Sequence, residues 1–295
     1  MSLALRALTA EPWAIEPSWL PLLAALAQRN SSAPEIEAAK EYQKRDYDLM
    51  AGPGAQKLAG SYRSYAVDGV AVIPVTGPIF PRANMMTEMS GATSVTMLQN
   101  DYRAALANGD IGAIMLLMDS PGGAVSGINA FADTVFAGAK KKHTVAFVAG
   151  QACSAAYWIA ASASEIVLER TGIVGSIGVV VAMAKQKETD ANGYVDIEIV
   201  SSNAPNKRPD PESEEGRSEI VSMLDAIETL FIADVARGRG VSAAKVKSDF
   251  KQGGVDIGAA AVALGMADRV QSQEATLGAL RRGVASQRKL QSLKQ

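Results

Sequence analysis

Cysteine and histidine are almost absent from this sequence. Its 295 residues contain one cysteine, Cys153, and one histidine, His143. A single cysteine excludes a disulfide within the chain, and the two residues are too few for a Cys/His metal cluster. One histidine also makes a Ser-His-Asp triad a poor expectation. We therefore expect a protein that uses no metal and no cofactor.

Excess charge and long apolar runs are lacking as well. The net charge of −2 gives no electrostatic reason to bind nucleic acid or an anionic membrane. The apolar runs at 19–27 and 173–184 are shorter than the ~20 residues that cross a bilayer. The N-terminal residues lack the basic region and continuous apolar core of a signal peptide. We expect a cytoplasmic protein with no membrane anchor and no nucleic-acid partner.

Composition divides the chain into three parts. Residues 1–64 hold two short helical patterns with proline and glycine breakers, which predicts an N-terminal helical extension. Residues 65–270 alternate strand and helix patterns, which predicts an α/β domain with largely parallel strands. Residues 271–295 carry many Lys, Arg and Gln, which predicts a polar tail, helical or disordered.

The most informative stretch runs from residue 144 to residue 160. The apolar, β-branched run 144–149 predicts a buried strand, and the small, alanine-rich residues after Gly150 predict a helix that begins near Ser154. Backbone N–H groups at such a turn lack partners and can stabilise a developing oxyanion. Ser154 is therefore a candidate nucleophile, although capping the helix is the commoner role for such a serine. Cys153 is also conceivable as a nucleophile, but a small buried cysteine is commonly a packing residue.

A serine hydroxyl needs a neighbouring base that accepts its proton. His143 lies one strand length before Ser154, so the two should sit at opposite ends of that strand. Lysine is the remaining candidate for the base. Lowering a lysine pKa from ~10.4 to about 7 requires roughly 4 to 5 kcal/mol of desolvation or like-charge repulsion. That demands a mostly apolar pocket, often completed by neighbouring subunits.

A second turn can supply oxyanion donors. The sequence Asp119-Ser120-Pro121-Gly122-Gly123 directly follows the apolar run 111–118, which predicts a buried strand. Paired glycines leave N–H groups free to adopt unusual dihedral angles, although Pro-Gly-Gly is most often a simple turn. The order of strand, glycine turn, helix, strand and serine turn places both donor turns at the same ends of adjacent parallel strands.

Three separate blocks resemble the signal peptide peptidase A (SppA) family of Ser-Lys peptidases. They are 119–123, 153–160 and Gly172-Ile173-Val174-Gly175-Ser176-Ile177-Gly178-Val179, in the family's order and spacing. The resemblance covers about residues 65–270. It implies a crotonase/Clp-protease-like spiral of ββα units, and an endopeptidase that acts on protein or peptide substrates as a homo-oligomeric ring.

The resemblance also implies the site residues. Ser154 falls on the family's nucleophile, and Ser176 falls on the helper serine that orients the lysine. The backbone at Gly122 or Gly123, and near Ser154 and Ala155, falls on the oxyanion donors. This sequence has alanine at Ala155 and the next position, where glycines often follow the nucleophile. The change leaves every catalytic group in place.

The general base is expected at Lys207. It follows Ser154 by 53 residues and lies in a serine-containing turn after the apolar run that ends at Val200, in agreement with the family. A solvated loop lysine is the ordinary interpretation of such a residue. Lys185 and Lys187 are the competing bases, and surface charge is the better interpretation of both.

Two branches of the family fit the sequence. The N-terminal residues, with Trp13, Pro17 and Trp19, are similar to those of phage and prophage head maturation proteases, which cleave scaffold, portal or capsid proteins in the prohead. A bacterial cytosolic signal-peptide-peptidase-like protease is the alternative. A crotonase-type acyl-CoA enzyme and an inactive assembly scaffold remain as further alternatives.

Overall fold

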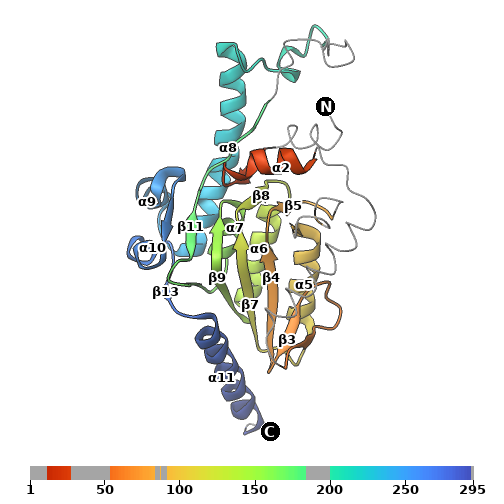
Figure 1. Ribbon diagram of the computed structural model, residues 1–295, viewed down its shortest axis with the longest axis vertical. Helices are drawn as coiled ribbons and strands as arrows, with labels where there is room; N and C mark the ends of the chain where they lie inside the picture. The colour runs from red at the N-terminus through yellow and green to blue at the C-terminus, as the bar shows by residue number, and fades with distance from the viewer. Residues whose placement is uncertain (1–11, 28–53, 84–86, 88–91, 184–199, 294–295) are drawn as a thin grey trace.

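The computed structural model describes residues 12–27, 54–83, 87, 92–183 and 200–293. Its strands, drawn in Figure 1, are β1 (Trp13–Ile15), β2 (Gln56–Lys57), β3 (Tyr65–Val67), β4 (Val70–Thr76), β5 (Ile79–Phe80), β6 (Thr93–Ser94), β7 (Ala113–Ser120), β8 (Gly122–Ala124), β9 (His143–Cys153), β10 (Glu165–Leu168), β11 (Ile173–Gly175), β12 (Val255–Ile257) and β13 (Arg269–Val270). Its helices are α2 (Trp19–Ala27), α5 (Val95–Ala107), α6 (Ile128–Ala139), α7 (Ala155–Ala161), α8 (Glu214–Arg239), α9 (Ala243–Asp249), α10 (Gly258–Leu264) and α11 (Gln273–Ser292), with short 3₁₀ turns η1 (Pro205–Lys207) and η2 (Lys251–Gly253).

A nine-stranded sheet forms the centre of the molecule. Its order is β12-β11-β9-β7-β4-β3-β2, and β10 and β13 extend it beside β9. Strands β4, β7 and β9 are parallel, with Leu116 of β7 between Ile73 of β4 and Ala146 of β9. The first half of β9 pairs with β10 and its last three residues pair with β11. The α/β fold with a parallel core is therefore confirmed.

Both faces of this sheet are buried, which accounts for the continuous apolar runs of its strands. Along β7, Leu116 and Met118 belong to the cluster that includes residues of α5, α6, α7 and α8. Met115 and Leu117 point to the opposite face, where they cluster with Leu280 of α11. Because successive side chains of β7 point to opposite faces, this one strand packs against helices on both sides of the sheet.

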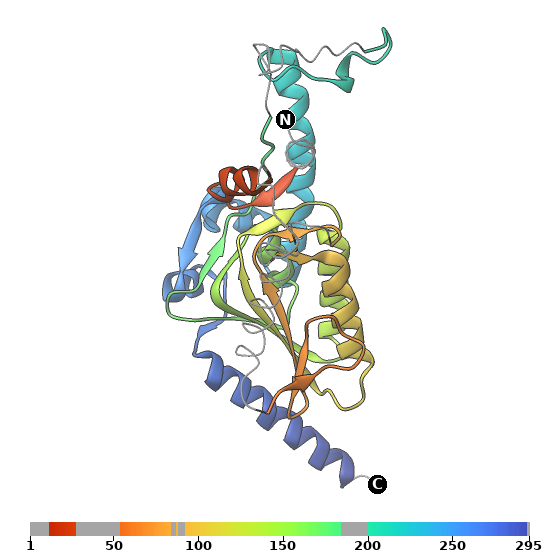
Figure 2. The same ribbon diagram turned by 45° about the vertical axis from the view of Figure 1, so that its right-hand side comes forward.

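The two ends of the described chain both contribute to this core. The segment expected to be a polar tail forms α11, and its Leu280 and Val284 are buried against the sheet. Figures 1 and 2 show α11 at the lower end of the molecule. The expected N-terminal extension contains helix α2, but also β1, which joins a second sheet of order β1-β8-β5-β6. The second expected helix, 36–50, lies outside the described residues, and the domain boundaries stay predictions.

Helix α8 holds α7 in place. Trp158 of α7 stacks on Phe231 of α8, with ring centroids 4.4 Å apart and an angle of 6° between the planes. The Trp158 Nε1–H donates to an Asp234 carboxylate oxygen at 2.8 Å. At the end of α8, Arg239 donates to both oxygens of Asp268 at 2.8 and 2.9 Å. Because α7 begins directly after Ser154, these contacts fix the position of that residue's turn.

Among the described residues, no helix combines the length and apolar character that crossing a membrane requires.

Replacing Phe231 by alanine should lower the free energy of unfolding by about 3–5 kcal/mol, because it removes the stacked ring and leaves a cavity beside Trp158. Urea denaturation followed by tryptophan fluorescence measures the change. The adjacent Leu230 is 56% exposed and serves as the matched control, for which Leu230→Ala should change stability by no more than ~0.5 kcal/mol. Equal stability of the two variants would contradict the proposed role of α8.

Candidate active site

Ser154 connects β9 to α7 in a strained conformation. Its φ is 54° and its ψ is −119°, a region that side-chain-bearing residues rarely adopt. The Ser154 N–H donates to the Gly175 carbonyl at 2.8 Å, and its own carbonyl accepts from the Trp158 N–H at 2.9 Å. Within the described residues its side chain makes no capping bond to α7, and Oγ instead points to the Gly178 carbonyl at 3.4 Å. The hydroxyl is thus available for a role other than capping.

Ser176 repeats this geometry on the neighbouring strand. It follows β11 with φ 54°, and its N–H donates to the Gly254 carbonyl at 2.8 Å. Cys153 and Gly175 are register partners in the parallel pair of β9 and β11. Ser154 and Ser176 therefore lie side by side at the ends of two adjacent strands.

The glycine turn lies against the same point. Gly122 has φ 104°, and a Cβ there would lie 2.9 Å from the Cys153 carbonyl oxygen and would overlap that of Ala14. A Cβ on Gly123 would overlap the carbonyl of Ile79. Glycine is therefore required at both positions because backbone approaches from three sides. The Gly122 N–H donates to Ser120 Oγ at 3.3 Å.

Ala155 is the first residue of α7, so its N–H has no partner within the helix. Two of the three expected donor positions thus adjoin Ser154: Ala155 follows it in the chain, and Gly122 lies against Cys153, the residue before it, with Gly123 next to Gly122. Their action as an oxyanion hole stays a prediction.

Lys207 is not brought to this point in the single chain. It is an exposed residue of η1, and its N–H donates to the Ala204 carbonyl at 3.1 Å. Figures 1 and 2 both show segment 200–213, in teal, at the far end of α8, away from the sheet. The competing bases Lys185 and Lys187 lie outside the described residues. The role of Lys207 therefore stays a prediction, and it requires a change in the position of this segment.

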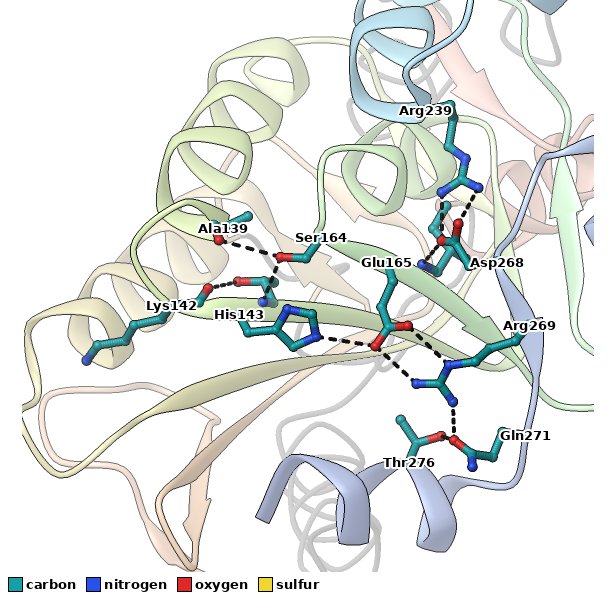
Figure 3. Close-up of polar contacts among 12 residues, drawn as sticks. Ala139, Lys142, His143, Ser164, Glu165, Arg239, Asp268, Arg269, Gln271 and Thr276 are labelled. Atoms are coloured by element: carbon teal, nitrogen blue, oxygen red, sulfur yellow. Dashed lines mark hydrogen bonds and ion pairs between the residues drawn. The ribbon is translucent and has the colours of Figure 1, made fainter. Parts of the chain in front are cut away.

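His143 is separated from Ser154 as the strand length predicts. It begins the eleven-residue strand β9, and Ser154 follows the end of that strand. Figure 3 shows its Nε2 facing Glu165 Oε1, 3.3 Å away, with Arg269 on the other side of the same carboxylate. The hydrogen bond to His143, followed by that to Arg269, lowers the pKa of Glu165 to about 2. This cluster lies beside the start of α11.

Cys153 is a packing residue. Burial, with a smaller contribution from the negative charge of Glu16, raises the pKa of its thiol to about 12. A thiol with this pKa stays protonated at neutral pH and is a poor nucleophile. Of the two adjacent candidates, Ser154 remains the predicted nucleophile.

Two features were not found from sequence. Asp119 lies at an irregularity in the pairing of β7 with β9, where its Oδ1 accepts the Gln151 N–H at 3.2 Å, and burial raises the pKa of its carboxyl. Strand β1 lies against the glycine turn, with Ile15 opposite Gly122. In the sequence, β1 is visible only as a short apolar segment, Trp13–Ile15, between Pro12 and Pro17. The strand with which it pairs cannot be inferred from the sequence pattern.

A sequence model of peptidase family S49 matches residues 137–287, about half of the chain. The head-tail preconnector protein GP5 of Enterobacteria phage P21 is 27% identical over 267 residues, covering 88% of this chain and 53% of that protein. The capsid assembly protease C of Escherichia phage lambda is 29% identical over 212 residues, covering 70% of this chain and 48% of that protein. The chain thus spans about half the length of these relatives.

Iodoacetamide at pH 8 should not modify Cys153 in the folded protein, because the thiol is buried and protonated. Mass spectrometry of the intact protein measures the reaction. The same protein in urea is the control and should take up one alkyl group. Rapid modification without urea would show that Cys153 is a reactive thiol.

Glu165→Gln should destabilise the protein at neutral pH and have little effect near pH 2. The folded-state pKa of about 2 lies below the ordinary value of 4.5, so the carboxylate stabilises the fold above pH 4.5, and this contribution is lost as the pH falls toward 2. Urea midpoints at several pH values measure the difference.

The control for Glu165→Gln is Asp133→Asn, which breaks the exposed ion pair with Arg237. This control should change the urea midpoint little at any pH. A Glu165→Gln effect that does not depend on pH would contradict the assignment.

Proposed function

Because the chain belongs to peptidase family S49, we propose that it is a serine endopeptidase with Ser154 as nucleophile and Lys207 as general base. The observation that carries the proposal is the turn at Ser154. A buried serine with positive φ, aimed away from the helix that it precedes, stores strain that helix capping does not require. Strain of this kind is typical of residues that a fold holds ready for chemistry.

In the proposed reaction, Ser154 Oγ attacks the carbonyl carbon of the scissile bond while Lys207 Nζ accepts the hydroxyl proton. The carbonyl oxygen becomes an oxyanion that accepts hydrogen bonds from the backbone of the glycine turn, Gly122–Gly123, and of Ala155. Collapse of this intermediate breaks the C–N bond, and the lysine returns its proton to the leaving amine. Water then hydrolyses the acyl-enzyme with the same base. Ser176 orients Lys207.

This mechanism requires that Lys207 reaches Ser154, and we assign that step to the assembled homo-oligomer. The support is the part of α8 that precedes its contact with α7, where the apolar side chains of Val221 and Met223 are exposed. A neighbouring copy that covered this surface would remove water from the same end of the molecule. Removing water favours the neutral lysine that a general base requires.

The proposed substrates are proteins of a phage head, namely scaffold, portal or capsid proteins cleaved in the prohead within the host cytoplasm. Support comes from two relatives, a capsid assembly protease of phage lambda and a head-tail preconnector protein of phage P21.

Ser154→Ala and Lys207→Ala should each lower kcat/KM for peptide cleavage by at least about 10³-fold, because nucleophile and base act as one unit. Cleavage of candidate head proteins, read by mass spectrometry, measures activity. Lys185→Ala is the matched control and should retain the activity of the unaltered protein.

Full activity of Ser154→Ala would contradict the proposed nucleophile. Loss of activity in Lys185→Ala together with an active Lys207→Ala would move the base to Lys185. Circular dichroism of each variant separates loss of chemistry from loss of fold.

A further inference from the structure

Strand β1 is hydrogen-bonded on both sides. On one side it pairs antiparallel with β8, with Ala14 opposite Gly123 and Ile15 opposite Gly122. On the other side, Trp13 and Val180 exchange two backbone hydrogen bonds, each 2.8 Å long. A three-residue strand therefore fills a slot between two other backbone segments.

Both edges of this slot belong to the candidate active site. β8 begins with the glycine turn, and Val180 lies two residues after Gly178, whose carbonyl accepts from Ser154 Oγ. The segment that forms this edge therefore also carries the carbonyl that accepts from Ser154 Oγ, two residues from the isolated Trp13–Val180 bridge. The Ser154 hydroxyl thus points to one edge of the slot.

The crowding at Gly122 shows how closely β1 approaches the glycine turn. A Cβ placed on Gly122 would lie 3.0 Å from Ile15 Cα and 2.9 Å from the carbonyl oxygen of Cys153, the residue before Ser154. The next residue, Glu16, donates its N–H to the Pro121 carbonyl at 2.8 Å. The backbone of residues 14–16 therefore runs across the glycine turn directly beside the nucleophile.

Ser154 has no exposed surface in this state. An extended peptide binds a protein by adding a strand to free backbone edges, and the edges that flank Ser154 are β8 and Val180. We propose that residues Trp13–Glu16 occupy the substrate slot of this protease as an internal inhibitor, and that a substrate binds by displacing them. This inference rests on the proposed peptidase function and adds to it a means of control.

The occupant also indicates the kind of peptide that the slot accepts. Trp13 is buried and packs edge-on against Phe80, with ring centroids 5.9 Å apart, and Ile15 is buried in the same cluster. Ala14 between them is a small residue, fully buried in the main core cluster. The slot therefore fits an extended segment of the pattern large apolar, small, large apolar.

A reversible crosslink tests the displacement. Trp13 and Ala124 are register partners, and the backbone groups of Trp13 bond to Val180, so the pair is of the non-hydrogen-bonded kind. Such pairs have Cα atoms about 4.5 Å apart, within the range of a disulfide. The double variant Trp13→Cys/Ala124→Cys should lock β1 in the slot when oxidised and release it when reduced.

Labelling by a fluorophosphonate probe and binding of a fluorescent peptide are the two readouts. Reduction should speed the labelling of Ser154 at least tenfold. A peptide with the sequence of residues 11–17 should bind the reduced form and not the oxidised form, measured by anisotropy with Ser154→Ala added to prevent cleavage. The single variant Ala124→Cys, treated identically, is the control and should not respond to oxidation.

The outcomes separate this inference from the proposed function. Equal peptide binding in both redox states, or binding in neither, overturns the inference and makes β1 a permanent strand. Equal labelling in both states overturns the inference while it leaves Ser154 as the nucleophile. Peptide binding in the reduced form alone, with no labelling in either state, retains the slot and contradicts the peptidase.

Discussion

The candidate site depends on one backbone hydrogen bond, from the Ser154 N–H to the Gly175 carbonyl. This bond continues the parallel pairing of β9 and β11 by one residue, past the point at which the chain must turn into α7. Ser154 makes this hydrogen bond and also begins the turn into α7, and it does so with a positive φ. Its hydroxyl then points away from the helix, toward the Gly178 carbonyl. The strain is held by surroundings that cannot relax, since the Trp158–Phe231 stack fixes α7.

The parts of the fold that sequence predicted are those with local signals. The apolar runs of β7 and β9 predicted buried parallel strands, and the two strands pair in parallel. The turn at Ser154 was predicted because composition changes abruptly from β-branched to small residues. His143 was predicted to lie away from it because a strand has a fixed rise per residue.

The parts that sequence did not predict depend on distant partners. Strand β1 has three residues and no periodicity, and only its pairing with β8 and Val180 defines it. Helix α11 is polar overall, and the apolar spacing of Leu277, Leu280 and Val284 is visible as a face only once the sheet that it covers is known. Lys207 was predicted as the base, but the structure places it in an exposed turn at the far end of α8 (Figure 1), and its role stays a prediction. Composition carries no signal for any of these.

The central claim is that Ser154 and Lys207 form one catalytic unit in a slot that β1 fills in the resting protein. A crystal structure of the assembled protein after reaction with a peptide boronate tests it most directly. The account predicts a covalent bond from Ser154 Oγ to boron, Lys207 Nζ within hydrogen-bonding distance of that oxygen, and the peptide in the place of Trp13–Ile15. A boronate bound to another residue, or bound to Ser154 with Lys207 remote and β1 in place, would contradict it.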